Sequence, residues 1–435
     1  MQYLLYLALA MGLLVSPDAL IVLGNQVGSV GRAFLGMIFF TGMIALGTTY
    51  STAALWAQFP RAGGEARGLQ MAFGTLPAMV LPLCARVVFL VCASTGMLAI
   101  AGYVFNEVFI YWFPNLGFSF CVLGVLLTLN LLGPKVAKTA QLLFVAVALL
   151  GLVVLSVMAF LGGTDAALTP AMMRPSSAGL LRGTLGSLLL FVGVDLAFFL
   201  PRPRAQPSIP VGKCVAGGII LGGMTFCIWS LVSVSTVPAG QLVDSTVPHM
   251  VTARTILGQP GRIIMGVVVL AGVSSAVNAL LLGVVQMLVG MASQGLLPAF
   301  LARAPQRAPV ALILLALGPA MMMYLGMAGE PETEVYTRAG LVFWLVHYGA
   351  IHLAVLVLSH RADRPPLRRF FPVLPAVSMS LIVLGIGGLL WIDSHPGYLI
   401  RFMLTVVGSV SGLSLAWMGW CRKQGHTVLP RPGAH

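Results

Sequence analysis

Apolar runs of helical length recur along almost the whole chain, separated by short stretches rich in Gly, Pro and charged residues. A helix needs about 20 apolar residues to cross the roughly 30 Å hydrocarbon core of a bilayer. The pattern predicts twelve spans, near residues 4–24, 34–58, 78–105, 118–132, 139–162, 183–200, 212–237, 262–291, 309–327, 335–358, 373–392 and 399–420. No polar block between them is long enough for a separate soluble domain. The sequence therefore predicts an all-α integral membrane protein.

The composition and the charge distribution agree with this prediction. Of the 435 residues, 59% are hydrophobic and 8% are charged, whereas about a quarter of the residues in soluble domains are charged. Of the 24 Lys and Arg residues, sixteen fall in loops on the amino-terminal side of the membrane, seven fall in loops on the other side, and Arg86 lies inside a span. The positive-inside rule then predicts a multi-pass protein of the plasma membrane with both termini in the cytoplasm. The net charge of +13 is thereby explained by topology, and no nucleic-acid partner is expected.

Motifs for catalysis are missing from the sequence. There is no Walker lysine loop, zinc signature or nucleophile elbow, and the six cysteines lie mostly in apolar runs without metal-ligand spacing. We therefore expect neither an enzyme nor a bound organic cofactor.

After the charged residues at the span ends are assigned to the loops, three remain well inside the predicted spans: Asp18, Asp195 and Arg86. Each costs about 3 kcal/mol at the centre of a bilayer unless it faces a cavity or a partner. Asp18 follows Pro17, and Asp195 comes two residues after Gly193, so spans 1 and 6 are expected to be interrupted near their middle. Arg86 lies close enough to the end of span 3 to reach the interface, and snorkelling is the favoured interpretation. Its alternative is a counter-charge for an acid in the inner vestibule.

The two interruptions predict an internal symmetry. They are 177 residues apart and separated by an odd number of spans, so a second unit would enter the membrane from the opposite side. This favours a 5+5 inverted repeat, with residues 1–162 as the first unit and 183–359 as the second. Two additional helices follow within 372–420, and then a short cytoplasmic tail, 421–435. Paired broken helices in such repeats indicate a substrate site near the bilayer midplane.

Several segments carry a resemblance to a known family. They are PRAGGEARGLQMAFG (60–74), NLLGPKVAKTAQ (130–141), LLFVGVD (189–195), IPVGK (209–213) and SSAVNALLLGVVQMLVGMASQGLLPAFL (274–301). With these segments in this order, the chain resembles the amino acid-polyamine-organocation superfamily of secondary transporters, which share the inverted-repeat fold of the bacterial leucine transporter. The resemblance implies a substrate between spans 1, 3, 6 and 8, in contact with Val15, Ser16, Pro17 and Asp18 and with Phe191, Val192, Gly193 and Asp195.

Span 1 departs from the pattern of this superfamily. Its amino-acid permeases usually have a glycine-rich unwound segment there, whereas this chain has Ser16, Pro17 and Asp18. The added carboxylate favours an amine-bearing solute or a protonated Asp18. If Asp18 and Asp195 share one dry chamber, like-charge repulsion favours a proton on one of them. We therefore expect proton-coupled symport, or exchange, of an amino acid or amine by alternating access. The alternative for Asp18 is that it only caps amides freed by the break.

The resemblance also raises the question of the coupling ion. Ala271, Ser274 and Ser275 have the spacing of the sodium site in sodium-coupled relatives, but small polar residues there also pack helices in members that use no sodium. Some proton-coupled relatives place a lysine of span 5 in that position, and the corresponding residue here is Ala148. The sequence thus leaves proton, sodium and exchange open.

Two other kinds of protein remain possible at this stage. One is a non-transporting membrane subunit or sensor on the same scaffold, and the other is a transporter of the major facilitator class. His347 and His352 of span 10 are candidates for proton relay, but their spacing of five places them on different faces of a helix.

Overall fold

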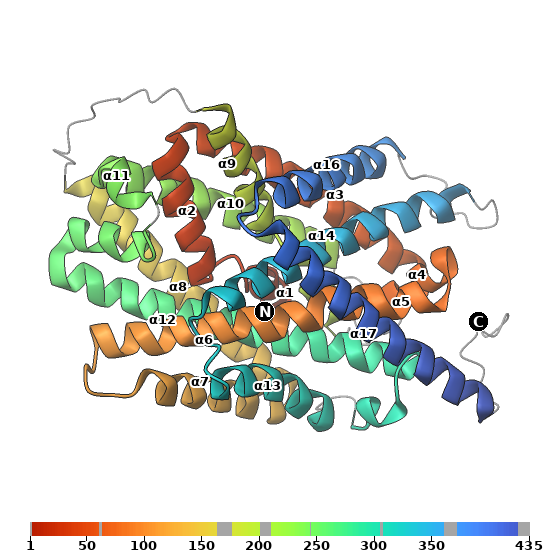
Figure 1. The fold of residues 1–435 in the computed structure, drawn as a ribbon. Helices are drawn as coiled ribbons and strands as arrows, with labels where there is room; N and C mark the ends of the chain where they lie inside the picture. The colour runs from red at the N-terminus through yellow and green to blue at the C-terminus, as the bar shows by residue number, and fades with distance from the viewer. Residues whose placement is uncertain are drawn as a thin grey trace.

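The structure is a computed structural model that describes residues 2–60, 63–162, 176–200, 210–243, 245–304, 308–360 and 372–424. All regular secondary structure in these residues is helical, and the helices form one bundle (Figure 1). Nine helices are long and apolar enough to cross a membrane, and α7 (Asn115–Leu131), α13 (Pro309–Tyr324) and a helix pair at the start of the chain supply the other spans. The twelve-span prediction is therefore confirmed. The predicted cytoplasmic segments 201–209, 361–371 and 425–435 lie outside the described residues.

Span 1 is broken. Helix α1 (Gln2–Ala10) ends before residues 11–16, and α2 (Pro17–Val30) begins directly after them. Ser16 is extended (φ −69°, ψ 154°), and its Oγ accepts a hydrogen bond from the Ala19 amide at 3.3 Å. Because a proline at the first helical position needs no partner for an amide, Pro17 starts a new helix instead of kinking an old one. Asp18 consequently lies in the first turn of α2, where the helix dipole favours a negative charge.

Span 6 is broken as well. Helix α9 (Ser177–Leu189) is followed by a turn at 190–193 and then by a short 3₁₀ helix, η2 (Val194–Phe199). Gly193 has φ 90°, in the left-handed region that only glycine adopts easily. A Cβ atom there would lie 2.7 Å from Cδ2 of Leu13, so the break in span 6 packs directly on the break in span 1.

The remaining helices of the first half follow the predicted order. They are α3 (Ala33–Gln58), a short helix α4 (Gly64–Phe73), a third span made of α5 (Thr75–Pro82), the π-helical turn η1 (Leu83–Val87) and α6 (Val88–Val108), and finally α7 and α8 (Pro134–Leu161). The second half contains α10 (Val211–Thr236), α11 (Ala239–Leu242), α12 (Pro248–Ser293), η3 (Ala299–Ala302), α13, α14 (Pro331–His360), α16 (Val373–Ile392) and α17 (Pro396–Lys423).

The most buried long helix organises the packing. Helix α12 contacts α8 and α6 along the bundle, and α14 contacts α6, α3 and α16 (Figure 1). Helix α12 bends at Gly258, whose φ of 64° is non-helical, just before Pro260. Near the centre of this core, α1 and η2 contact each other, and the chain at both breaks is buried. The fold therefore places two unwound segments of backbone inside the bundle.

Candidate functional site

The two unwound segments form the centre of the candidate site. In the described part of the chain, the backbone amides of Leu13, Leu14 and Phe191 donate no hydrogen bond. Buried amides normally have a partner, since an unpaired one costs about as much free energy as a lost hydrogen bond. The break thus supplies donors that a ligand's negative groups can satisfy.

Helix α12 closes one side of this centre. A Cβ atom at Gly272 would clash with the Val15 carbonyl oxygen, so glycine is needed for α12 to approach the break. Val15 and Ser16 therefore lie beside α12, and Gly193 lies beside Leu13, as the resemblance implied for spans 1, 6 and 8.

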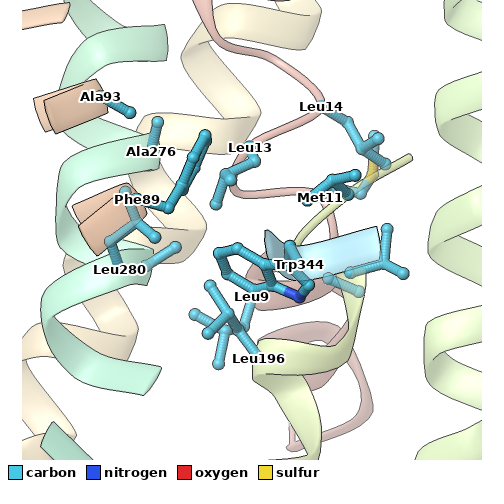
Figure 2. Close-up of a cluster of buried hydrophobic side chains, with 14 of the residues drawn as sticks. Leu9, Met11, Leu13, Leu14, Phe89, Ala93, Leu196, Ala276, Leu280 and Trp344 are labelled. Atoms are coloured by element: carbon cyan, nitrogen blue, oxygen red, sulfur yellow. The ribbon is translucent and has the colours of Figure 1, made fainter. Parts of the chain in front are cut away.

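Apolar side chains fill the space around the breaks. Figure 2 shows Leu13, from the unwound segment, close to Phe89 of α6 and Trp344 of α14, with Leu196 of η2 below. The rings of Phe89 and Trp344 pack edge to face, with centroids 5.3 Å apart. All four side chains are buried. We call this arrangement, in which buried side chains fill the space around the two breaks, the closed conformation.

A small cavity lies on the other side of the break in span 6. It is lined by residues of α3, α9, α14 and α16 together with Phe191, namely Thr41, Ile44, Ala45, Thr48, Leu188, Phe191, Leu345, Tyr348 and Ile382. Its volume of about 10 Å³ has room for one water molecule.

Arg86 does not snorkel, and the favoured sequence interpretation was wrong. Its side chain is 0% exposed and lies in the π-helical turn η1. Nη1 and Nη2 donate to the two carboxylate oxygens of Glu65 at 2.8 and 3.0 Å, and Nη2 also donates to Oδ2 of Asp195 at 2.5 Å. The guanidinium also lies over the Phe199 ring, 4.7 Å from its centroid. The alternative interpretation, a counter-charge for an acid, describes the geometry.

Asp195 is held on three sides. Besides Arg86, its Oδ1 accepts hydrogen bonds from Nε1 of Trp344 at 3.1 Å and from the Tyr348 hydroxyl at 2.6 Å. The same hydroxyl accepts a hydrogen bond from the Gly193 amide at 3.1 Å. Asp195 therefore ties the short helix η2 to η1 and α14.

The structure gives Asp18 different surroundings from those of Asp195. Asp18 makes no hydrogen bond or ion pair with the described residues, and the charged residue that acts on it is Glu334 of α14. Asp195, in contrast, is bound by Arg86, Trp344 and Tyr348. Asp18 and Asp195 do not contact each other among the described residues, and a chamber shared by the two acids stays a prediction.

The sequence analysis did not identify Glu65 as a member of the charge cluster, and it named His347 as a candidate for proton relay without naming its partner. Glu65 falls between the second and third predicted spans, on the predicted cytoplasmic side, but it lies in the first turn of α4, after the left-handed Gly63, and is 1% exposed. His347 lies within 2.9 Å of Glu65, from Nε2 to Oε1. The sequence contained one sign of this position: in the motif AGGEARG (62–68), two glycines directly precede Glu65. His352 points elsewhere, to Thr48 and Ser51 at 3.1 and 2.8 Å, as its spacing from His347 predicted.

The candidate ion site stays a prediction, and its two serines make hydrogen bonds to other protein groups. Ser275 donates to the Gly12 carbonyl at 3.1 Å, and the Gln141 amide of α8 donates to Ser275 Oγ at 2.9 Å and to the Ala8 carbonyl at 3.3 Å. Ser274 instead bonds to Leu270 of its own helix, and Ala271 is buried. The polar side chain that span 5 contributes here is Gln141, not a residue at position 148.

Fold and site together define a class: a multi-span secondary transporter with two broken helices around a buried centre. The chain belongs to the amino acid permease family, whose model matches residues 2–410. This membership points to a transporter and not to an enzyme.

Solved structures agree at the level of the fold. A manganese transporter of Eremococcus coleocola, bound to an aromatic bis-isothiourea compound, is similar with a TM-score of 0.62 and 12% identity, over 97% of this chain and 94% of that one. Two single-residue variants of the same transporter are similar with TM-scores of 0.61, at 12% and 13% identity and with the same coverage. At this identity the likeness establishes the fold alone.

Proposed function

We propose that this protein carries an amino acid with an apolar side chain across the membrane by alternating access. The observation that carries the proposal is the group of unpartnered amides of Leu13, Leu14 and Phe191 at the meeting point of the two breaks. Backbone amides in unwound transmembrane helices suit a substrate carboxylate. The neighbouring Leu13, Phe89 and Trp344 offer apolar surface to a side chain.

The amino group of such a solute requires an acceptor or an acid. Asp18 is the acid of the broken span 1 that has no ion-pair partner among the described residues, and it begins α2 directly after the unwound segment. An ammonium group paired with this carboxylate would offset the cost of keeping a charge in the membrane. Asp18 is therefore the proposed amine-recognising residue.

Coupling to protons is favoured over coupling to sodium. The Gln141 amide already donates to Ser275 Oγ and the Ala8 carbonyl, oxygens of the kind that a sodium ion would bind. A neutral amide in this position holds α1, α8 and α12 together without an ion. Transport is accordingly proposed to be independent of sodium, and either driven by a proton gradient or by exchange.

Uptake by the purified full-length chain in liposomes tests the function. The informative pair is labelled L-leucine and isoamylamine, which is leucine without its carboxylate. We expect uptake of leucine that depends on an inward proton gradient or on internal unlabelled leucine, does not change when choline replaces sodium, and is at least tenfold faster than uptake of isoamylamine.

Other outcomes would point elsewhere. Equal uptake of leucine and isoamylamine would contradict a carboxylate held by the amides. If the liposomes take up neither of these two compounds, nor any other apolar amino acid, the result would favour a non-transporting subunit or sensor. Because the manganese transporter shares the fold, labelled Mn²⁺ is included, and its uptake would replace the amino-acid proposal.

A further inference from the structure

The charge cluster around Arg86 carries one negative charge too many. Two carboxylates, Glu65 and Asp195, face a single guanidinium, and all three side chains are at most 3% exposed. Charges this deeply buried are costly unless they are paired. The guanidinium carries one positive charge and contacts both carboxylates. One negative charge of the cluster therefore has no positive charge to balance it.

His347 is the group placed to balance it. Its Nε2 lies 2.9 Å from Oε1 of Glu65, and its Nδ1 has no hydrogen-bond partner among the residues that the structure describes. The ring is 0% exposed. Burial of the ring and Arg86 from η1 disfavour a proton on it, whereas Glu65 from α4 and Asp195 from η2 favour one. A proton on this ring would give the four side chains a net charge of zero.

We propose that Glu65 and His347 form a proton-binding site, occupied by one proton in this closed conformation. Histidine is the side chain whose charge changes most readily near neutral pH, and a carboxylate in contact with the ring is the group that retains the proton. The Trp344 indole and the Tyr348 hydroxyl, which bind Asp195, are neutral donors and do not replace the missing positive charge.

The site is built from parts that belong to different elements. Glu65 lies on α4, Arg86 on η1, Asp195 on the broken span 6, and His347 on α14. Movement of η2 or α14 away from the others would separate a carboxylate from its partners and change the affinity for the proton. Any such difference between two conformations couples proton binding to the conformational change, in both directions. This coupling rests on the proposed transport function, whereas the proton site itself does not.

Histidine protonation can be measured without a substrate. The full chain is labelled with ¹⁵N-histidine, reconstituted in bilayers and titrated by solid-state NMR, with the His347 signal assigned from its loss in His347→Gln. We expect a charged imidazolium at pH 6, and we expect it to be absent at pH 6 in Glu65→Gln. A neutral His347 ring across pH 5 to 8 in the wild type would overturn the proposal, as would a signal unchanged by Glu65→Gln.

Transport then tests the use of the proton. His347→Gln retains a hydrogen-bonding side chain and is expected to lose about tenfold or more of the uptake stimulated by a proton gradient, while it keeps exchange. His352→Gln is the matched control, since that ring is also buried on α14 but faces only the hydroxyls of Thr48 and Ser51. Equal loss in both variants would overturn the role of His347. If His347 is charged but the protein takes up no amino acid, the proton-binding site is supported and the proposed transport function is refuted.

Discussion

At the scale of single residues, Arg86 is the most consequential side chain of the core. A fully buried arginine is tolerated where its terminal N–H groups donate to carboxylates and its plane lies over aromatic rings, and here both kinds of contact are present. Such clusters are poor sources of net stability, because desolvation offsets most of the attraction. Removal of only one partner nevertheless destabilises a protein strongly, because the remaining charge stays buried without compensation.

Arg86→Ala should therefore destabilise the protein strongly. Glu65 would keep its contact to His347, and Asp195 its contacts to the neutral donors Trp344 and Tyr348. Both buried carboxylates would nevertheless lose the guanidinium, at a cost of about 3–5 kcal/mol. The midpoint of thermal unfolding in detergent, followed by fluorescence, measures this effect. Arg262→Ala is the control, because Arg262 pairs with Glu107 at 3.6 Å with 30% of its side chain exposed, and pairs of this kind contribute about 1 kcal/mol or less.

The same physics predicts a rescue. Arg86→Met combined with Glu65→Gln and Asp195→Asn removes every full charge of the cluster, and a neutral core of similar volume is often as stable as a buried ion pair. The triple variant should regain most of the unfolding midpoint lost in Arg86→Ala. A triple variant as unstable as the single one would show that packing, and not charge, holds this region together.

At the scale of elements, a set of buried hydrogen bonds connects α1, α8 and α12. Gln141 donates to Ser275 and to the Ala8 carbonyl, and its own carbonyl accepts from Asn278 of α12 at 2.8 Å. Asn278 in turn accepts from Asn130 of α7 at 2.8 Å. This chain of buried amides fixes the end of α1 without an ion.

The two adjacent serines of α12 allow this connection to be tested. Ser275→Ala removes the bond to the Gly12 carbonyl and leaves the Gln141 amide short of an acceptor, and such buried losses cost about 1–3 kcal/mol. We expect a lower unfolding midpoint and slower uptake of whichever amino acid the liposome assay identifies. Ser274→Ala should leave both unchanged, because Ser274 bonds only within its own helix. If sodium restores the unfolding midpoint of Ser275→Ala, an ion can replace the missing contact. If Ser274→Ala and Ser275→Ala lower the midpoint and the uptake equally, the proposed connection through Ser275 is contradicted.

At the scale of the whole molecule, the sequence predicted what depends on local chemistry. The length of the apolar runs predicted the spans, and Pro17 and Gly193 predicted the two breaks. A proline's missing amide and a glycine's positive φ change the backbone within one helical turn, so both effects can be predicted from the local sequence. The family resemblance rather than periodicity indicated that spans 1, 6 and 8 meet. The inverted repeat itself stays a prediction.

Long-range pairing could not be predicted in the same way. Glu65 and Arg86 are 21 residues apart, and Glu65 and His347 are 282 apart. A single sequence gives no measure of which of many possible partners a charge selects. Glu65 was therefore interpreted as a loop residue and Arg86 as an interfacial anchor, whereas α14 packs against both α4 and η1, the elements that carry them.

Orientation in the membrane is the prediction that concerns the whole chain at once. Sixteen basic residues in one set of loops against seven in the other predict that both termini lie in the cytoplasm. Tyr111, 80% exposed between α6 and α7, then faces the outside. Tyr111→Cys should react with a membrane-impermeant maleimide in intact cells, whereas Lys423→Cys at the end of α17 should react only after lysis, each measured above the labelling of the native cysteines. The reverse pattern would invert the topology. It would also move Glu65 and the proposed proton site from the cytoplasmic half of the protein to the outer half, and so reverse the side from which a proton reaches His347.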